Sequence, residues 1–254
     1  MTIRDEVKSN PVNTGVIIIK GLYKSFGANK VLVNFNLELH KGENVAILGK
    51  SGSGKSVLIK CIIGLLRPDS GSINVLGRDI YELSIHELDE VRTKVGFLFQ
   101  SNALYDSMTV RENLEFPLRR HSIKLSTSER DKKVMEVLTN VGLAHTVDMM
   151  PVELSGGMRK RIALARTLIL NPDIILYDEP TTGLDPITGK EISSLIKEIG
   201  EKYNTSALII SHDMGCIRMT ADRIVILIEG RCYAQGTYDE LKKNTDSKVK
   251  QFFE

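Results

Sequence analysis

The chain has 254 residues, a length typical of one or two globular domains. Its 34 Lys and Arg residues and 32 Asp and Glu residues leave a net charge of +2, and 42% of the residues are hydrophobic. This balance argues against a disordered chain and against a strongly basic nucleic-acid binder. The longest apolar runs, such as Ile224–Ile228, are far shorter than the roughly 18–20 residues of a membrane-spanning helix, so we expect a chain that does not cross a bilayer by itself.

The cysteines and the first residues bear on location. Cys61, Cys216 and Cys232 lie far apart and form no CxxC pair, which argues against a zinc site or a redox dithiol and favours a reducing compartment. Residues 1–14 are polar and contain no apolar stretch of the kind found in secretory signals. We expect a flexible N-terminus and a cytosolic chain.

The first part of the chain is typical of β-strands. Val16–Ile19 and Val31–Val33 are short apolar runs, and Phe35–Leu39 alternates apolar and polar residues as a half-buried antiparallel strand does. Val45–Leu48 is apolar throughout, which is the pattern of a strand buried on both faces. It leads directly into a glycine-rich loop and then into a helix with its body at 57–66.

The middle of the chain has a helical pattern. Two segments, 109–112 and 126–129, fit the S/T-x-x-E capping box that begins a helix. One face of the second helix is marked by Val134, Val137, Leu138 and Val141. Helices are therefore expected after Gln100.

A second strand and helix block follows. Ile174–Tyr177 and Ala207–Ile210 are apolar runs that predict buried strands. The helix face between them is marked by Ile192, Leu195, Ile196 and Ile199. Because strands that alternate with helices form parallel sheets, the fold class is predicted to be α/β. Residues 224–228 and 231–234 then predict a hairpin, and a short helix is expected to begin near Tyr238.

The segment Gly49–Ser56 fits the phosphate-binding pattern G-x-x-x-x-G-K-[ST] in the required place, after a strand and before a helix. Its glycines let successive backbone N–H groups turn towards an anion, and the helix N-terminus adds its dipole. Lys55 would reach the β- and γ-phosphates, and the Ser56 hydroxyl would be a ligand for Mg²⁺. The predicted phosphate-binding residues are Gly49, Lys50, Ser51, Gly52, Ser53, Gly54, Lys55 and Ser56.

Two carboxylates follow the strand at 174–177. Asp178 and Glu179 are expected at the carboxyl edge of the parallel sheet, where ligands of open α/β folds bind. Asp178 would hold Mg²⁺ through its water shell, and Glu179 would polarise the water that attacks the γ-phosphate. His212 could reach the γ-phosphate from the same edge, although a histidine at a strand end is more often structural.

A second glycine turn begins another helix. Ser155–Gly157 precede Arg159–Arg161, which lie in the first helical turn, where the helix dipole disfavours positive charge. That placement indicates a nearby anion, with a solvated basic face as the alternative. Because one nucleotide fills only one phosphate cradle, we expect a head-to-tail symmetric dimer, with each nucleotide between Lys55 of one subunit and Ser155 of the other.

Six elements occur in order, namely Gly49–Ser56, Gln100, Leu154–Met158, Asp178–Glu179, Gly183–Asp185 and His212. Together they resemble the ATP-binding-cassette (ABC) ATPases over nearly all of the chain, from about Val16 to Leu241. The resemblance implies a single nucleotide-binding domain at 15–254 of the P-loop NTPase fold. Its RecA-like parallel sheet is expected to carry an N-terminal antiparallel β subdomain and an inserted α-helical subdomain at roughly 101–165.

The resemblance also implies roles for individual residues, with ATP and Mg²⁺ as cofactors. Phe26 would stack on adenine, although Tyr23 is close to it, and Gln100 would sense Mg²⁺ and the γ-phosphate. The catalytic residues would be Glu179, His212 and Lys55, and the metal residues would be Ser56, Gln100 and Asp178. Contacts across the dimer would come from Ser155, Gly156, Gly157 and Asp185.

Several sequence segments narrow the resemblance to one group of ABC ATPases. The segments 98–110, 116–121, 150–158, 185–188 and 249–252 are similar to the ATPase subunits of MCE-associated phospholipid transporters, which include the maintenance-of-lipid-asymmetry systems of Gram-negative bacteria. This implies a homodimer at the cytoplasmic face of the bacterial inner membrane. Its partners would be an integral membrane permease and a membrane-anchored MCE-type lipid-binding protein, with phospholipid as cargo.

Apolar residues in the loop after Gln100 bear on the permease. They are Ala103, Leu104, Tyr105 and Met108. They fit a socket for a helix of the permease or, alternatively, packing inside the helical region.

Other function classes fit less well. ABC ATPases of importers or exporters for another substrate share the general motifs. A soluble ABC protein of DNA repair would need a long coiled coil before Ser155, and members that act on ribosomes usually carry two cassettes. A regulator without turnover conflicts with Glu179, and a small-molecule kinase gives no reason for the Ser155–Gly157 turn. No nucleic-acid partner is expected.

Overall fold

The computed structural model describes residues 15–121 and 123–254, so residues 1–14, predicted to be flexible, lie outside the described residues. One layer is a 4-stranded antiparallel sheet with the order β2-β1-β4-β5. Its strands are β1 Gly15–Phe26, β2 Asn29–His40, β4 Ser70–Val75 and β5 Arg78–Asp79. The half-buried antiparallel strand predicted at Phe35–Leu39 is confirmed, because alternate residues of it are buried and it pairs with β1.

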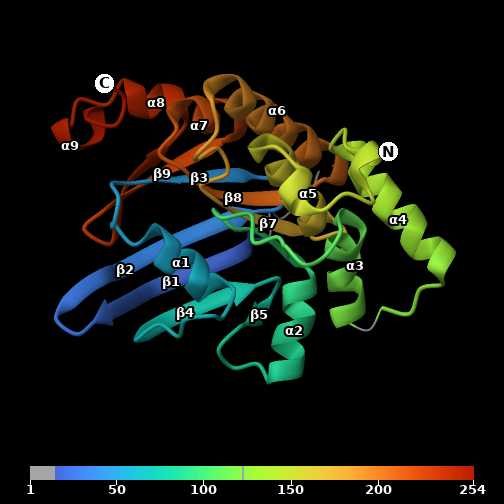
Figure 1. The fold of residues 1–254 in the computed structure, drawn as a ribbon. Helices are drawn as coiled ribbons and strands as arrows, with labels where there is room; N and C mark the ends of the chain where they lie inside the picture. The colour runs from blue at the N-terminus through green and yellow to red at the C-terminus, as the bar shows by residue number, and fades with distance from the viewer. Residues whose placement is uncertain (1–14, 122) are drawn as a thin grey trace, which may run out of the picture.

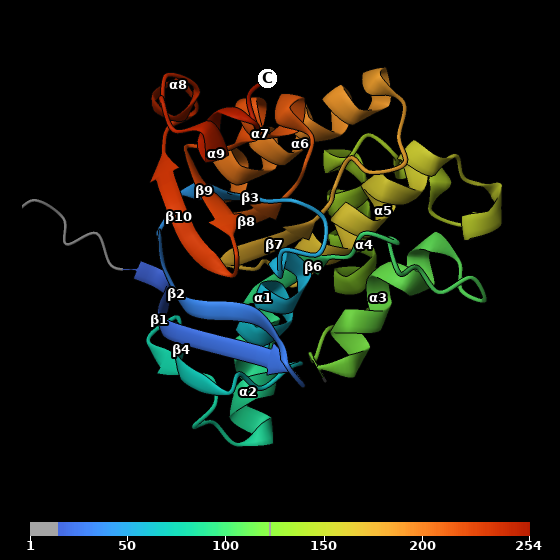
Figure 2. The same ribbon diagram turned by 90° about the vertical axis from the view of Figure 1, so that its left-hand side faces the viewer.

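A second layer is a 6-stranded sheet with the order β10-β9-β3-β8-β7-β6 (Figures 1 and 2). Its strands are β3 Asn44–Leu48, β6 Val95–Leu98, β7 Ile174–Asp178, β8 Ser206–Ile210, β9 Arg223–Ile228 and β10 Arg231–Gly236. Neighbouring strands are parallel except β9 and β10, which form the predicted hairpin. The predicted parallel core is therefore confirmed.

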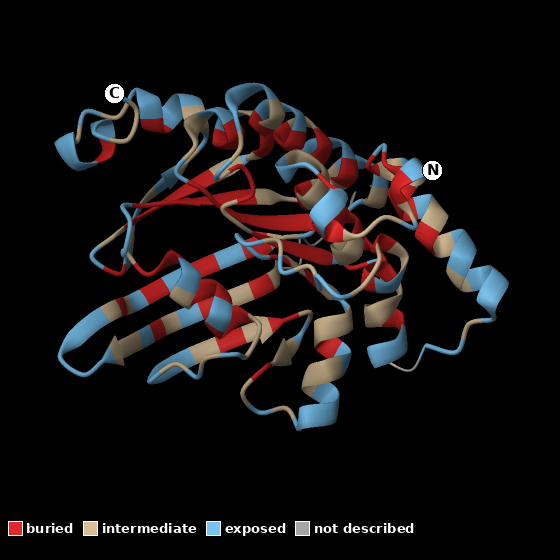
Figure 3. Cartoon of the chain, viewed as in Figure 1, coloured by how far each residue is buried: buried red, intermediate tan, exposed pale blue. Residues whose placement is uncertain are grey.

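Helices and the smaller sheet cover this core. The helices outside the region 101–165 are α1 Lys55–Ile62, α2 Ile85–Thr93, α6 Pro186–Tyr203, α7 Met214–Thr220, α8 Tyr238–Lys242 and α9 Ser247–Lys250. Ile174 and Leu176 of β7 face a cluster shared with α1 and the antiparallel sheet, whereas Ile175 and Tyr177 face a cluster that contains residues of α6. The central strands are accordingly the most buried part of the molecule (Figure 3).

The region predicted as helical lies to one side of the sheets (Figure 1). It contains α3 Val110–Arg120, α4 Thr127–Asn140, η1 Ala144–Thr146, η2 Pro151–Glu153 and α5 Gly156–Leu168. Both predicted capping boxes are present, at Thr109 before α3 and at Ser126 before α4. The predicted α4 face is buried, with Val141 just beyond the helix.

Three features differ from the prediction. β2 is one strand where two were expected, because its pairing with β1 continues on both sides of a register shift that contains Asn34, with a φ of 50°. α1 ends at Ile62 and not at residue 66, since Gly64 is left-handed and the Leu65 N–H donates back to the Lys60 carbonyl at 2.9 Å. The segment 70–98, for which no element was predicted, holds β4, β5, α2 and β6.

The parallel order brings the loops after β3, β7 and β8 to one edge of the sheet. These loops carry most of the residues that the sequence singled out. Within residues 15–121 and 123–254, no helix has the length and apolar character needed to span a membrane.

Candidate functional site

The loop between β3 and α1 is wrapped around the Lys55 ammonium group. Its Nζ donates hydrogen bonds to the carbonyl oxygens of Gly49 at 2.8 Å and Lys50 at 3.1 Å. Gly54 has a φ of 105°, and a Cβ atom there would lie 2.9 Å from the Val31 carbonyl oxygen. Only glycine fits both conditions, which explains why the residue before Lys55 has no side chain.

Lys55 is a buried cationic residue. Burial lowers the pKa of Lys55, and the nearby charges of Glu179 and Asp178 oppose that shift. The ammonium group can exchange its carbonyl partners for the oxygens of a bound anion. This arrangement suits a phosphate ligand.

Ser56 and Asp178 meet across the sheet edge. The Ser56 hydroxyl donates a long hydrogen bond of 3.4 Å to Oδ1 of Asp178, the last residue of β7. Burial and the charge of Glu179 raise the pKa of Asp178, while Ser56 and nearby lysines oppose the shift. The pair therefore presents two oxygen donors of the kind that Mg²⁺ prefers.

Glu179 is fixed at the same edge. Its N–H donates to the Ile210 carbonyl at 2.9 Å, and its backbone is left-handed with a φ of 51°. Its Oε2 atom lies 2.8 Å from Nδ1 of His212 and accepts a 3.2 Å hydrogen bond from the Thr182 hydroxyl. The carboxylate thus has one oxygen held by two side chains from two different loops.

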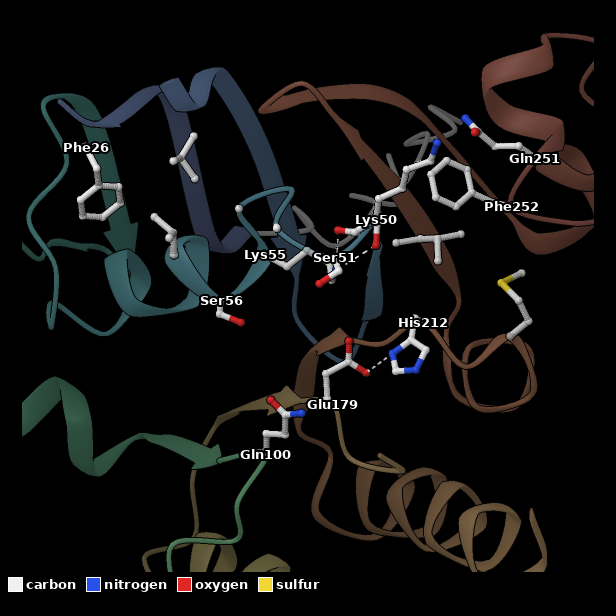
Figure 4. Close-up of a pocket in the computed structure, with 17 residues that line it drawn as sticks. Phe26, Lys50, Ser51, Lys55, Ser56, Gln100, Glu179, His212, Gln251 and Phe252 are labelled. Carbon is white, nitrogen blue, oxygen red and sulfur yellow. Dashed lines mark hydrogen bonds and ion pairs between the residues drawn. The ribbon is translucent and has the colours of Figure 1, made fainter. Parts of the chain in front are cut away.

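Lys55, Ser56, Glu179 and His212 face one cavity of about 890 Å³, which we call the phosphate-loop cavity (Figure 4). Ser53 and Asp178, which also belong to the predicted set, are not among the described residues that line it. Gln100, which follows β6 by two residues, lies across it from the phosphate loop. Phe26, at the end of β1, also lines the cavity and is half exposed, whereas Tyr23 is not among the described residues that line it. The remaining members of the predicted set that line it are Gly49, Lys50, Ser51, Gly52, Gly54, Lys55, Ser56, Glu179 and His212.

Part of the cavity wall was missed by sequence reasoning. Gln251 and Phe252, directly after α9, line the cavity next to Lys50, and so does Met214 at the start of α7. Gln251 and Phe252 are about two hundred positions from the phosphate loop in the sequence, and no local pattern predicts that they approach it. The sequence singled out the segment 249–252 only as part of the resemblance, with no role in the site. Val249 of α9 packs in the cluster that contains residues of β3 and β9.

The second glycine turn lies elsewhere. Ser155 is the N-cap of α5, where its hydroxyl accepts from the Met158 N–H at 3.2 Å. Among the described residues that line the phosphate-loop cavity, Ser155, Gly156 and Gly157 do not occur. Asp185, the N-cap of α6, lines a different cavity of about 770 Å³. The structure of one chain therefore does not bring the two predicted phosphate cradles together.

The basic residues after this turn have protein partners. Arg159 donates to the Leu154 carbonyl at 2.8 Å, and Arg161 pairs with Glu191 at 2.8 Å. Lys160 is 1% exposed and donates to the Gln100 carbonyl at 3.0 Å. A solvated basic face, the alternative weighed from the sequence, is therefore wrong for Lys160.

Comparison with known proteins places the chain in a family. The sequence pattern of the family described as ABC transporter matches residues 32–182. Over 239 residues the chain is 44% identical to a Mycobacterium leprae protein named probable ribonucleotide transport ATP-binding protein mkl, an alignment that covers 94% of this chain and 69% of that protein. The chain thus spans about two thirds of the length of the mycobacterial relatives, with 66% for the Mycobacterium bovis protein.

The names of two further relatives state different substrates. The chain is 41% identical to the intermembrane phospholipid transport system ATP-binding protein MlaF of Haemophilus influenzae, over 95% of this chain and 91% of that protein. It is 38% identical to the methionine import ATP-binding protein MetN of Rhizobium johnstonii, over 92% of this chain and 64% of that protein.

Among solved structures, one neighbour is a dimeric post-hydrolysis state of the ATP-binding cassette MJ0796 bound to ADP and Pi. It has a TM-score of 0.79 and 34% identity, and the match covers 87% of this chain and 98% of that chain. The fold, the family match and these relatives agree with the ATPase predicted from the sequence. The chain belongs to the ABC transporter family, as an ATP-binding subunit with ATPase activity.

Proposed function

We propose that this chain binds MgATP between two copies of itself and that its ATP hydrolysis drives phospholipid transport between bacterial membranes through a separate permease. The observation that carries the ATPase part is the convergence of Lys55, Ser56, Asp178, Glu179 and His212 on one sheet edge. The lipid part rests on the likeness to the phospholipid transport protein MlaF, which extends over 91% of that protein.

The residues fit a magnesium ion. Ser56 and Asp178 lie 3.4 Å apart with oxygen atoms towards each other, and Gln100 faces them from the other side of the cavity. We assign Ser56, Asp178 and Gln100 to the metal, with water and phosphate oxygens completing its shell. When bound, the ion would neutralise part of the charge on the phosphate oxygens.

Glu179 is assigned as the base for the attacking water. Its Oε2 atom accepts from Thr182 and contacts His212, so we assign proton acceptance to Oε1. His212 is exposed, with a side-chain exposure of 68% against 12% for Glu179, and can turn towards an incoming γ-phosphate. Lys55 and the backbone N–H groups of the phosphate loop would bind the phosphates, and Phe26 would stack on adenine.

The proposed dimer is based on the separation of the Ser155–Gly157 turn from the phosphate loop in one chain. Ser155–Gly157 lie outside the phosphate-loop cavity of their own chain, so a second chain must supply this turn to a bound nucleotide. MJ0796 is described as a dimer with ADP and Pi, which supports the same arrangement here. Removal of the γ-phosphate would take away contacts that bridge the two chains and would favour opening.

A permease helix would dock beside Gln100. A groove of about 440 Å³ is lined by Ala103, Tyr105, Phe116 and Pro117, and we assign it as the socket. Leu104 packs into the helical cluster, which is the alternative that the sequence left open for this loop. Tyr105 is 42% exposed and stacks near Phe116, with ring centroids 4.8 Å apart. This apolar groove suits a partner at the cytoplasmic face of the inner membrane.

Copurification tests the proposal. The full chain, tagged and extracted from its native membranes in detergent, should bring down a polytopic permease, a membrane-anchored MCE-type protein and bound phospholipid, all identified by mass spectrometry. Tyr105→Asp should lose the permease while it keeps ATP binding. A permease for amino acids or nucleotides in place of the lipid-binding partner would overturn the phospholipid assignment and leave the ATPase assignment standing.

A further inference from the structure

The loop that follows Gln100 has an unusual backbone. Asn102 and Ala103 are consecutive and both are left-handed, with φ values of 65° and 51°. Residues with a Cβ atom adopt this conformation at a cost, and two in succession are rare. Contacts outside the loop must therefore hold it in this shape.

Helix α5 supplies those contacts. Lys160 Nζ donates to the Gln100 carbonyl at 3.0 Å. Arg166, six residues further along α5, donates from Nη1 to the Ala103 carbonyl at 2.7 Å and from Nη2 to the Asn102 carbonyl at 3.0 Å. Two cations of one helix thus bind three carbonyl oxygens of the loop, including those of both left-handed residues.

Burial of the Lys160 ammonium group costs free energy. Lys160 is 1% exposed, and a buried ammonium group is stable only with polar partners. Burial lowers the pKa of Lys160, while the charge of Asp178 opposes that shift. The Lys160 ammonium group thus has the Gln100 carbonyl as its hydrogen-bond acceptor.

Arg166 also contacts the apolar groove that lies beside the Gln100 loop. Its guanidinium lies 5.9 Å from the ring centroid of Tyr105 and lines the groove that contains Phe116 and Pro117. One helix therefore binds the backbone of Gln100 at one end and a wall of the apolar groove at the other. Ser155 is the N-cap of the same helix.

We propose that Lys160 and Arg166 are positioning residues that fasten the Gln100 loop to α5, so that Gln100 and the Ser155 turn move as one body during turnover. The proposal rests on the proposed function, because it concerns how Gln100 is placed against the γ-phosphate. The phosphates themselves would be held by Lys55 and its loop, and no residue of α5 is among the described residues that line the phosphate-loop cavity. Loss of Lys160 should therefore affect the rate of hydrolysis more than the affinity for ATP.

Lys160→Met tests this in the full chain, because methionine keeps most of the volume and removes the charge and the donor. We expect the Kd for a fluorescent ATP analogue to change by no more than about twofold and kcat to fall by about 10- to 100-fold, the range expected for a misplaced catalytic group. Lys160→Gln, which keeps a donor for the Gln100 carbonyl, should restore part of kcat. Lys197→Met, an exposed lysine of α6, is the matched control.

A double-mutant cycle with Gln100→Ala separates positioning from general damage. If Lys160 acts by placing Gln100, Lys160→Met should lower kcat little further once the Gln100 side chain is absent. Equal loss in both backgrounds, or normal kcat in Lys160→Met, would overturn the proposal. If Lys160→Met does not fold, the same cycle is run with Lys160→Gln. In either variant we also expect faster amide hydrogen exchange at residues 100–103. Failure of ATP binding in the wild type would instead overturn the proposed function.

Discussion

The Nδ1 atom of His212 lies 2.8 Å from Oε2 of Glu179, although the two residues are 33 positions apart in the chain. They come from the loops after β8 and β7, which are neighbouring parallel strands. The contact orients the carboxylate at the sheet edge and leaves most of the imidazole accessible. A group that is held in this way and faces a phosphate-binding loop is well placed to act as a base.

Glu179→Gln should separate binding from hydrolysis. The amide keeps the size of the side chain but cannot accept the proton of water, so we expect phosphate release to fall by about 100-fold or more while ATP still binds. The variant should accumulate as a dimer when ATP is added, which size-exclusion chromatography with light scattering would detect. Glu201→Gln, an exposed acid of α6, is the control. Normal turnover in Glu179→Gln would assign the base to another residue.

Lys55→Ala should abolish nucleotide binding. The variant removes the cation that holds the Gly49 and Lys50 carbonyls together, and with it the partner of the phosphates. We expect the affinity for ATP to fall by at least about 100-fold, or roughly 2.7 kcal/mol. Equilibrium fluorescence titration measures this. Lys60→Ala, exposed on the same helix, should bind normally, and equal affinity of both variants would remove Lys55 from the site.

Mixed dimers test whether sites are shared between chains. Ser155→Arg should block the site formed with the partner's phosphate loop, and Lys55→Ala should disable its own loop. A pair that carries both defects on the same chain keeps no intact site, whereas a pair with one defect on each chain keeps one intact site. We therefore expect the two kinds of mixed dimer, made with separate affinity tags, to differ in ATPase rate. Identical rates would contradict a shared site.

The parts of the site that depend on local pattern were predictable. A buried strand followed by Gly49–Ser56 defines its own geometry, because the glycines and the start of α1 lie next to one another in sequence. Asp178 and Glu179 were expected at the same edge from the alternation of strands and helices alone. The structure brings Ser56 and Asp178 to 3.4 Å, in keeping with that expectation.

The parts that depend on contacts between distant segments were not predictable. The approach of Phe252 to Lys50 brings the segment after α9 to the phosphate loop, and the burial of Lys160 depends on how α5 packs against the Gln100 loop. The segment 70–98 was missed because its strands are short, yet Ser84 and Glu87 form a capping box that the sequence displays. The structural roles of Phe26, Gln100 and Asp185 towards a ligand stay predictions.

The contact between α5 and α6 gives a stability prediction. A Cβ atom on Gly157 would lie 2.7 Å from the Cγ2 atom of Thr188 in α6. Gly157→Ala should therefore destabilise the fold by about 1–3 kcal/mol, measured by thermal or urea unfolding. Thr188→Ser, which lacks Cγ2 but keeps its hydroxyl for Asp185, should restore much of that loss. Gly156→Ala meets nothing closer than 3.9 Å and is the control.

Acid should weaken the ion pair between Glu43 and Arg223 in a predictable pH range. Burial raises the pKa of Glu43, but hydrogen bonds from Arg223 and the His40 N–H and the charge of Arg223 outweigh it, so the pKa lies below its ordinary value of 4.5. Because the pKa is lower in the folded state, the stabilisation is complete above about pH 4.5 and is lost as the pH falls through the folded value.

Glu43→Gln measures this contribution. At pH 7 the variant should be less stable by about 1–3 kcal/mol, since Arg223 loses its charged partner. The difference from the wild type should shrink as the pH is lowered below about 4.5. Urea titrations at several pH values would show it, with Glu198→Gln as an exposed control. A difference that does not change with pH would contradict the assignment to the Glu43 carboxylate.

The separation of Ser155 from the phosphate loop of its own chain has a genetic consequence. When a cell makes a normal and a defective chain in equal amounts, random pairing leaves only about one quarter of the pairs wholly normal. A single faulty allele carried on a plasmid would then suppress the normal one, and the strength of that suppression would report how many working pairs the cell requires.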